Sequence, residues 1–330
     1  MKILIVTTQD RFFLSHIRDR ACYFRDQGYV VAVAAQKTSQ KYVDSIKALG
    51  FDFFDTRIIR RSINPLSQIL AIANLYSTNR KFKPDISFHL GAKAIFWGTI
   101  AARLYKRNTA VINAPIGLGY VFASDNWMAK LIRPFVLSLY RFLLNPTNSR
   151  VIIENEDDID FFVAKNCLHP GQAYCILGAG VDTVEFSPLP FSERNSVCTV
   201  VMASRLIKEK GVHEFIEVAN ELYKLKAPVR MQLLGEPDFG NPSSLSAKEL
   251  EELKQNPAIE YLGFQDNVSS IIRKAHICML PSYYREGLPR ILVEACCSGL
   301  AILTTNTVGC RETIRCDTGI AGMPSISGRR

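Results

Sequence analysis

Short apolar runs rich in Val and Ile alternate with amphipathic segments along most of this 330-residue chain. In the first 60 residues, the runs KILIVTT, YVVAVAA and FDFFDT are separated by the helical patterns SHIRDRACYFRDQ and KYVDSIKAL, which end at Gly28 and Gly50. Strands that are covered by helices on both faces read as continuous apolar runs. The alternation therefore predicts an α/β fold built on a doubly wound parallel sheet.

The alternation continues beyond this point and restarts once. It predicts a helix from Pro65 to Arg80 capped by Asn64, a further helix near 127–144, and strands at DISFHL, AVINA and RVIIEN. The proline-marked stretch FSPLPFSERNS then precedes a new series that begins at VCTVVMAS. We therefore expect two Rossmann-like domains, residues 1–190 and 191–330, with ligands bound in a cleft at the carboxyl ends of both sheets.

The charge of the chain is divided unevenly between its two halves. Residues 1–150 hold 22 Lys and Arg against eight Asp and no Glu, a balance of +14, whereas residues 151–330 hold 18 against 23, a balance of −5. A strongly positive domain attracts polyanions, either nucleic acid or an anionic membrane surface. No motif for reading DNA or RNA accompanies the basic residues, and composition alone does not choose between these partners.

Neither an export signal nor a disulfide framework is evident. No run approaches the roughly 18 apolar residues that cross a bilayer, and the opening MKILIVTTQDR becomes charged too early for a secretory signal. The nine cysteines are odd in number and lack C-x-x-C spacing. We expect a cytoplasmic protein whose cysteines are mostly reduced core thiols.

The glycine pattern argues against a dinucleotide cofactor. The first strand-to-helix connection, TTQDRFFLSH, contains no glycine, so it cannot form the G-x-G-x-x-G turn that brings a pyrophosphate to the backbone. GLGYVF (117–122) and GAGVDT (178–183) begin as G-x-G but lack the third small residue and the strand-helix context. An NAD-dependent dehydrogenase is therefore disfavoured.

Two cations follow the first strand of the second domain. The segment ASRLIKEKG (203–211) places Arg205 and Lys210 on a loop that ends in a glycine. A guanidinium and an ammonium at the carboxyl end of a strand can bind a diphosphate together. The alternative for these residues alone is an exposed charged loop.

The stretch REGLPRILVEA (285–295) separates Glu286 from Glu294 by eight positions around a Gly-Leu-Pro step. Pro289 suits the first turn of a helix and Gly299 its end. The first N–H groups of a helix have no partner within it, so those of residues 287, 288 and 290 would form an anion site. A helix-dipole role for Glu286 and simple exposure for Glu294 are the alternatives, but an acid inside ILVEACC points to a buried role.

Histidines and paired aspartates supply weaker signals. His16 opens the first helix and His89 is expected at the open end of the strand DISFHL, although an isolated histidine is more often structural. Asp158 and Asp160 match a D-x-D pair, but they follow Asn155 at a helix start, where acids favour the helix dipole. No metal and no other cofactor is predicted.

The segments SRLIKEKG and REGLPRILVEA, in this order on two domains, resemble the retaining glycosyltransferases of family four, which have the GT-B fold. The resemblance implies that Glu286, Gly287 and Leu288 bind the donor sugar. It also implies that Glu294 holds the ribose and that Arg205 and Lys210 hold the diphosphate. The implied catalytic set is Glu286, His89, Arg205 and Lys210, with no metal.

A bacterial subgroup is more similar still, through RFFLSH, NAPIGLGYVFAS, ENEDDIDFF, GAGVD, LLGEPDFGNPSS and VGCRET. Its members transfer an N-acetylhexosamine or related sugar from a UDP donor to an undecaprenyl-diphosphate-linked sugar, for O-antigen, capsule or glycan assembly. The resemblance implies that Phe13, His16 and Gly119 lie on the acceptor side. It also implies that the basic first domain docks on the anionic inner face of the cytoplasmic membrane.

The segment 127–144 mixes apolar residues with Lys130, Arg133 and Arg141, which suits an in-plane surface helix or a buried core helix. The resemblance stops near residue 323, so we expect the final C-terminal helices of the fold to be missing, with lower stability and weak or absent activity. The rival functions are a non-catalytic remnant that binds nucleotide-sugar and, more remotely, a nucleic-acid-binding protein.

Overall fold

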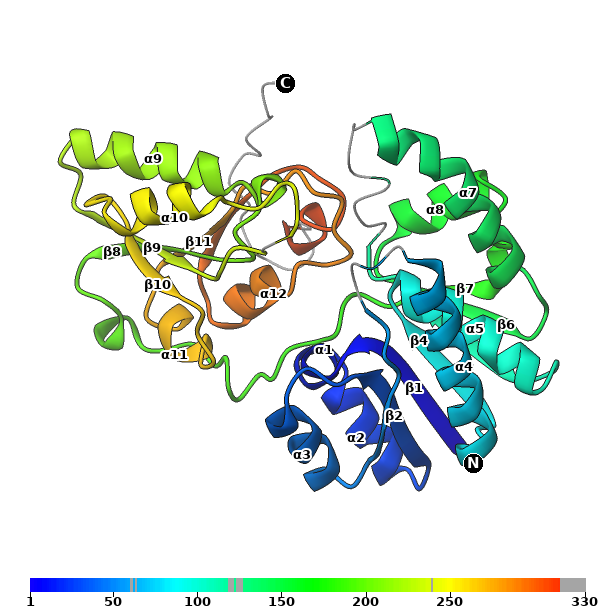
Figure 1. The fold of residues 1–330 in the computed structure, drawn as a ribbon. Helices are drawn as coiled ribbons and strands as arrows, with labels where there is room; N and C mark the ends of the chain where they lie inside the picture. The colour runs from blue at the N-terminus through cyan, green and yellow to red at the C-terminus, as the bar shows by residue number, and fades with distance from the viewer. Residues whose placement is uncertain (60–61, 63, 118–121, 123–126, 239, 315–330) are drawn as a thin grey trace. The chain divides into compact units, whose positions relative to one another are not determined.

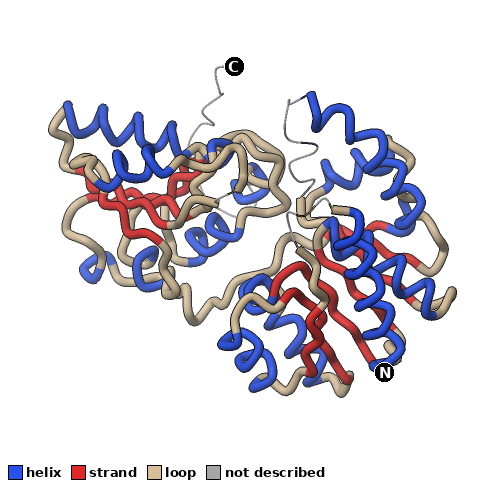
Figure 2. Tube along the Cα trace, viewed as in Figure 1, coloured by secondary structure: helices blue, strands red, loops and turns tan. Residues whose placement is uncertain are grey.

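The computed structural model describes residues 1–59, 62, 64–117, 122, 127–238 and 240–314. Its contacts divide the chain into two compact units, Met1–Ala179 and Gly180–Arg330. Each unit is a parallel sheet with helices packed against it (Figures 1 and 2). The predicted domain boundary, between residues 190 and 191, lies after this division, on the segment that leads to the first strand of the second sheet.

Seven parallel strands form the sheet of unit 1, in the order β3-β2-β1-β4-β5-β6-β7. β1 lies between β2 and β4, and Ile5 is in register with both Val33 and Phe88. The strand order reverses at this point, which is where ligands bind in doubly wound sheets. The strands are Lys2–Gln9 (β1), Val30–Gln36 (β2), Asp52–Asp55 (β3), Ile86–Leu90 (β4), Ala110–Ala114 (β5), Ser149–Ile153 (β6) and Ala173–Cys175 (β7).

Helices cover both faces of this sheet. Ile3 and Ile5 of β1 pack in one core with residues of α1, α2 and α3, whereas Leu4 and Val6 pack in another with residues of α4 and α5. This two-residue alternation is what a strand buried on both faces requires. The helices are Asp10–His16 (α1), Arg18–Asp26 (α2), Gln40–Ala48 (α3), Pro65–Phe82 (α4), Ala92–Tyr105 (α5), Trp127–Leu144 (α7) and Glu156–Ala164 (α8), with a short 3-10 turn at Pro170–Gln172.

The segment after β1 is helical, although the sequence predicts a loop there. α1 begins at Asp10, whose fully buried carboxylate accepts hydrogen bonds from the N–H of Arg11 at 2.7 Å and from the N–H and hydroxyl of Thr38 at 2.7 and 2.5 Å. Phe13 is fully buried and packs edge-on against Phe51. Its side chain belongs to the core of unit 1 rather than to an open acceptor side.

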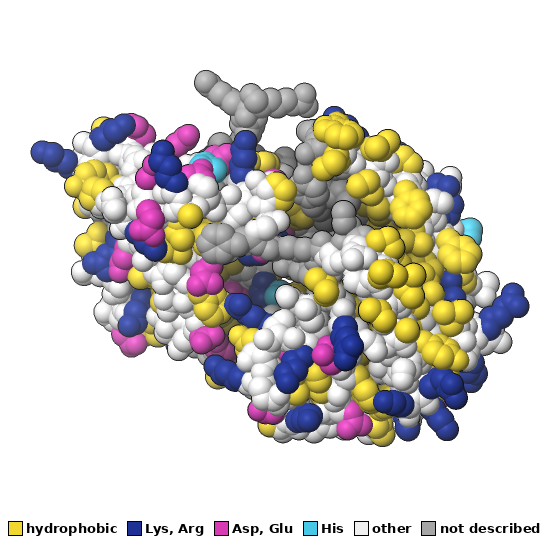
Figure 3. Space-filling model, in the orientation of Figure 1, with side chains coloured by type: hydrophobic (Ala, Val, Ile, Leu, Met, Phe, Trp, Pro, Cys, Tyr) yellow, Lys and Arg dark blue, Asp and Glu magenta, His cyan; other side chains and the backbone are white. Residues whose placement is uncertain are grey.

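α7 has one buried and one exposed apolar face. Tyr140, Leu143 and Leu144 are buried against α5 and α8. On the other face Trp127, Leu131 and Phe135, spaced by four residues, are 71%, 71% and 73% exposed. Hydrophobic side chains gather over the part of unit 1 that carries this helix (Figure 3). α7 is therefore neither wholly buried nor an ordinary polar surface helix.

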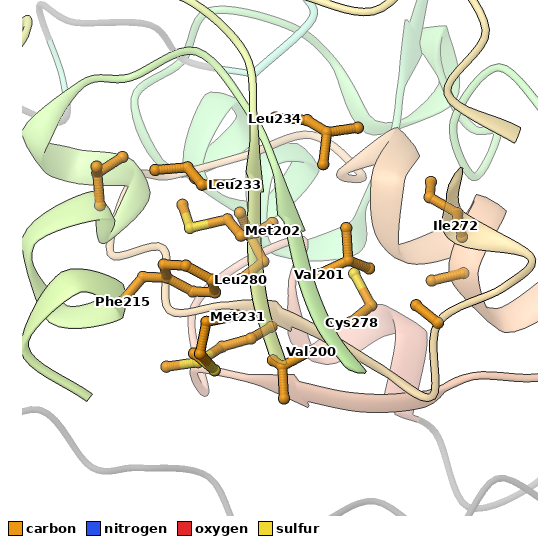
Figure 4. Close-up of a cluster of buried hydrophobic side chains, with 14 of the residues drawn as sticks. Val200, Val201, Met202, Phe215, Met231, Leu233, Leu234, Ile272, Cys278 and Leu280 are labelled. Atoms are coloured by element: carbon orange, nitrogen blue, oxygen red, sulfur yellow. The ribbon is translucent and has the colours of Figure 1, made fainter. Parts of the chain in front are cut away.

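Unit 2 repeats the plan with five parallel strands in the order β10-β9-β8-β11-β12. Met202 of β8, Leu233 of β9 and Leu280 of β11 lie on the side of the sheet that Phe215 of α9 covers (Figure 4). Val201 and Cys278 lie on the opposite side, together with Ile272. The elements are Cys198–Ala203 (β8), Val229–Leu234 (β9), Glu260–Gly263 (β10), Ile277–Leu280 (β11), Ala301–Thr304 (β12), Val212–Lys224 (α9), Ala247–Lys254 (α10), Ser269–Ile272 (α11) and Arg290–Cys297 (α12), with 3-10 turns at Phe191–Glu193, Lys208–Lys210 and Arg311–Ile314.

Candidate functional site

Four loops of unit 2 meet at the carboxyl ends of β8, β9, β11 and β12, and glycines let their backbones approach closely. Their described residues are 204–211, 235–238, 240–246, 281–289 and 305–310. A Cβ atom at each of three glycines would collide with the backbone of a neighbouring loop: at Gly211 it would lie 2.3 Å from the oxygen of Pro281, at Gly235 1.8 Å from that of Ser204, and at Gly309 2.3 Å from that of Gly287.

Lys210 and Glu286 form an ion pair across two of these loops. The Nζ atom of Lys210 donates to Oε1 of Glu286, and both side chains are 13% exposed. The hydroxyl of Ser282 also donates to Oε1, at 3.2 Å. The fold thus joins two residues that the sequence analysis selected separately, from loops after β8 and β11.

Glu209 forms hydrogen bonds that join the same loops. This role was not predicted from the sequence. The carbonyl oxygen of Glu209 accepts hydrogen bonds from the N–H groups of Tyr283 and Tyr284, at 3.0 and 3.1 Å, and from the hydroxyl of Ser282 at 3.1 Å. Its carboxylate accepts from the hydroxyl of Ser243 at 2.5 Å, in the loop after β9. No local pattern reports these contacts, because all the partners lie more than 30 residues away.

Arg205 lies on the same loop as Lys210 and also meets a carboxylate. Its Nη1 atom donates to Oδ2 of Asp238 at 2.7 Å. Asp238 belongs to the segment LLGEPDFGNPSS that contributes to the resemblance, although no local pattern marks it as a site residue. Each of the two predicted diphosphate-binding cations is therefore held by an acid from another loop.

Glu294 is buried in α12, about one turn after the helix begins at Arg290. Its side chain is only 9% exposed, and Nε of Arg290 donates to Oε1 at 2.5 Å. Burial raises the pKa of Glu294, and the Arg290 charge opposes that rise. Gly287 and Leu288 lie in the turn just before the helix, whose N-cap is Pro289. The interpretation that an acid inside ILVEACC is buried is thus correct.

This arrangement can bind a group with two or more negative charges. Arg205 and Lys210 supply two cations, and the positive end of the α12 dipole lies at the turn that carries Gly287. Lys210 has three donors on Nζ, so it can keep Glu286 and still bind a phosphate oxygen. Among the residues in the described ranges, no three His, Cys, Asp or Glu side chains gather as metal ligands would.

His89 does not reach the open end of its sheet, contrary to the prediction. Its side chain is 0% exposed, and Nδ1 lies 3.1 Å from Oγ1 of Thr99 and 3.0 Å from Oδ1 of Asn113. Gly98 of α5 makes room for the ring, since a Cβ there would lie 2.6 Å from Cδ2 of His89. The imidazole is thus enclosed between β4, β5 and α5.

Burial lowers the pKa of His89 to about 4, so its imidazole is neutral near pH 7. In the unfolded chain the same group takes up a proton near pH 6.5. We expect His89 to leave stability unchanged above about pH 6.5 and to lower it by up to about 3 kcal/mol as the pH falls to 4. Urea unfolding of the wild type and of His89→Gln across this range measures the effect. An equally steep loss of stability in the variant would contradict it.

His16 lines a pocket at the carboxyl ends of the unit 1 strands, and its acceptor-side role stays a prediction. Its ring stacks on Phe12, with centroids 4.3 Å apart. Arg20 of α2 and Glu154, which sequence reasoning missed, also line the pocket; burial lowers the pKa of Arg20 and the Glu154 charge opposes this. The apolar part of the lining comprises Ile17, Leu90, Ala114, Pro115, Ile116, Ile152, Ile176 and Ala179.

Two further predicted positions are accounted for. Gly119 lies outside the described residues. Asp158 is buried at the start of α8, where its N–H donates to Oδ1 of Asn155 at 2.8 Å. The D-x-D pair thus lies at the start of a helix, next to its N-cap. This is the structural role that the sequence analysis gave as the alternative to a metal site.

Family models match both halves of the chain. The model described as glycosyl transferase 4-like matches residues 2–155, and the model described as glycosyl transferases group 1 matches residues 191–322. The chain belongs to the glycosyltransferases. The matches cover the segments SRLIKEKG and REGLPRILVEA, and they confirm the resemblance on which the donor-side residues were selected.

Two curated relatives of this glycosyltransferase are bacterial enzymes. It is 25% identical over 327 residues to the N,N'-diacetylbacillosaminyl-diphospho-undecaprenol alpha-1,3-N-acetylgalactosaminyltransferase of Campylobacter jejuni, covering 92% of this chain and 82% of the relative. It is 23% identical over 278 residues to the UDP-Gal:alpha-D-GlcNAc-diphosphoundecaprenol alpha-1,3-galactosyltransferase of Escherichia coli, covering 81% and 68%. Both relatives are named for acceptors linked to undecaprenyl diphosphate.

A solved structure supports the fold. The glycosyltransferase superimposes on Anabaena HepE in complex with UDP-glucose with a TM-score of 0.71 and 20% sequence identity, covering 94% of this chain and 82% of HepE. The expected GT-B class, with two parallel-sheet α/β domains, is confirmed by this likeness together with the two sheets.

Proposed function

We propose that this glycosyltransferase moves a sugar from a UDP-sugar to a lipid-linked sugar acceptor in the assembly of a surface polysaccharide or other glycan. The transferred sugar is an N-acetylhexosamine or a related sugar, and its anomeric configuration is retained. The observation that carries the proposal is the ion pair of Lys210 with Glu286, just before α12, with Arg205 on the same loop as Lys210, in a chain of this family. The two bacterial relatives support the lipid-linked acceptor.

In this proposal unit 2 binds the donor. Arg205 and Lys210 bind the diphosphate, and the α12 N-terminus adds its dipole. As the bond to the sugar breaks, negative charge grows on the leaving diphosphate, and these groups stabilise it without a metal ion. Glu286 accepts hydrogen bonds from sugar hydroxyls, with Gly287 and Leu288 beside it.

Glu294 has a distinct role in binding the ribose. Its carboxylate is held by Arg290 inside α12, so its position is set before the donor arrives. A buried carboxylate accepts hydroxyl donors strongly because little water competes for it. This fixed acceptor discriminates a nucleotide sugar from a free sugar phosphate, which lacks the ribose.

Unit 1 binds the acceptor in this proposal. The pocket at the carboxyl ends of its strands is lined by His16, Arg20 and Glu154 together with apolar side chains. The +14 balance of residues 1–150 attracts the acceptor diphosphate and the anionic membrane that carries it.

The decisive experiment supplies a panel of radiolabelled UDP-sugars, with a bacterial membrane lipid extract as acceptor. Transfer of label from one UDP-sugar into the lipid fraction is the expected result. Release of the label by mild acid, which cleaves sugar diphosphates, distinguishes a lipid-diphosphate acceptor from other products. A folded protein that neither binds UDP nor transfers any label would overturn the proposal.

α7 supplies the membrane contact in this proposal, on the inner face of the cytoplasmic membrane. Its exposed face is apolar, and Lys130 lies next to Leu131 in the sequence to meet anionic headgroups. Among the described helices, none is both long enough and apolar enough to span a bilayer. In this proposal the exposed apolar face of α7 lies in the interface plane.

Replacing Leu131 and Phe135 by Glu is expected to weaken binding to anionic vesicles by at least about tenfold, because two inserted apolar side chains are lost. Vesicle co-sedimentation measures this. Leu225→Glu is the matched control, since Leu225 is 75% exposed in unit 2, and it should leave vesicle binding unchanged. Equal loss of binding in the control would count against α7 as the membrane contact.

A further inference from the structure

The ion pair between Arg205 and Asp238 is asymmetric. The Nη1 atom of Arg205 and Oδ2 of Asp238 are 2.7 Å apart, but the Arg205 side chain is 41% exposed and that of Asp238 only 13%. A half-exposed arginine has many rotamers open to it, whereas an enclosed aspartate has few. The acid is thus the fixed partner and the cation the adjustable one.

The backbone around Asp238 explains why the acid is fixed. The carbonyl oxygen of Asp238 accepts a hydrogen bond from the N–H of Asn241 at 2.8 Å, which closes a turn. The loop around this turn pairs with the loop that carries Arg205: the N–H of Leu206 donates to the oxygen of Glu236 at 3.0 Å, and that of Leu245 to the oxygen of Leu206 at 3.0 Å. Two anchored loops therefore hold the carboxylate beside Arg205.

The contact uses only part of the Arg205 guanidinium. A guanidinium has five N–H donors, and within the described ranges the side-chain hydrogen bond of Arg205 is the one from Nη1 to Asp238. The donors on Nε and Nη2 remain for another acceptor. The Asp238 carboxylate can therefore orient the guanidinium while leaving most of its N–H donors available.

We propose that Asp238 is a positioning residue that holds Arg205 ready for the donor diphosphate. This inference rests on the proposed function of unit 2. With Asp238 in place, the Arg205 side chain loses little rotamer freedom when the diphosphate binds. Less of the binding free energy is then spent on ordering the guanidinium. The opposite role, in which Asp238 competes with the diphosphate for Arg205, predicts that removing the acid tightens binding.

Calorimetric titration of UDP and of uridine into Asp238→Ala and Asp238→Asn proteins tests the inference. Asp238→Ala is expected to weaken UDP binding by roughly three- to tenfold. Asp238→Asn should stay within about twofold of the wild type, because its amide oxygen still accepts the hydrogen bond. Uridine lacks phosphates, so its affinity should not change. Asp26→Ala removes the similar 2.8 Å pair with Arg25 in unit 1 and serves as the control.

The outcomes separate the inference from the function on which it rests. Tighter or unchanged UDP binding in Asp238→Ala would overturn the positioning role, and so would equal losses of UDP and uridine, which mean a collapsed loop. A wild-type protein that binds no UDP would instead overturn the proposed function. Weaker UDP binding in the Ala variant, with recovery in the Asn variant, supports the inference.

Discussion

Glu286→Gln is expected to lower sugar transfer by at least about 100-fold, because a group that contacts the reacting sugar typically contributes that much. Gln keeps the size of the side chain and can still accept a hydrogen bond from Ser282, so the loop after β11 should hold its shape. The change removes the charge that pairs with Lys210. It also weakens the acceptor that the sugar hydroxyls require.

The measurement is the rate of label transfer from the preferred UDP-sugar, together with the calorimetric affinity for UDP. We expect UDP to bind Glu286→Gln within about tenfold of the wild type, since Lys210 and Arg205 remain. Glu251→Gln is the matched control: Glu251 pairs with Lys254 at 2.6 Å on the exposed α10. A Glu286→Gln enzyme that transfers sugar at the wild-type rate would remove Glu286 from the mechanism.

Gly211→Ala is expected to weaken UDP binding by at least about tenfold and to destabilise unit 2 by about 2 to 3 kcal/mol. The new Cβ would lie 2.3 Å from the carbonyl oxygen of Pro281, and Gly211 has a φ of +80°. The loop after β8 would have to move away from the loop after β11. That movement separates Lys210 from Glu286, which the two loops bring together.

Gly263→Ala is the control that distinguishes a collision with a neighbouring loop from the cost of a positive φ. Gly263 also has a positive φ, +63°, but a Cβ there meets nothing within 4 Å. The free energy of unfolding of this variant should fall by only about 1 kcal/mol, the cost of a left-handed conformation for Ala. The variant should bind UDP as tightly as the wild type. Thermal unfolding and UDP titration compare the two proteins. If both variants behaved alike, the contact with Pro281 would not be the reason for the Gly211 effect.

The elements that sequence reasoning predicted well depend on near neighbours. α4 begins at Pro65, with Oδ1 of Asn64 accepting from the N–H of Leu66 at 2.9 Å, and a cap of this kind involves residues only two positions apart. The burial of Glu294 likewise follows from its place in an apolar helical segment. Periodicity and capping are local properties, so they can be read without the fold.

The predictions that failed, and the residues that were missed, depend on partners far along the chain. α1 starts at Asp10 because Thr38, 28 positions later, donates to the Asp10 carboxylate. His89 is enclosed because α5 packs Gly98 against it, although its place near the end of a strand suggested exposure. Nothing within a few residues of Asp10 or His89 encodes these contacts.

The α/β class, the two sheets and the separate loops that carry Arg205, Lys210 and Glu286 can be predicted from local patterns along the chain. Which of these groups meet depends on how the strands are ordered in the folded sheet. The fold pairs Lys210 with Glu286 across 76 positions and Arg205 with Asp238 across 33. The physical reason is that loops at the ends of parallel strands are adjacent in space according to strand order, and strand order is a property of the whole sheet rather than of any one segment.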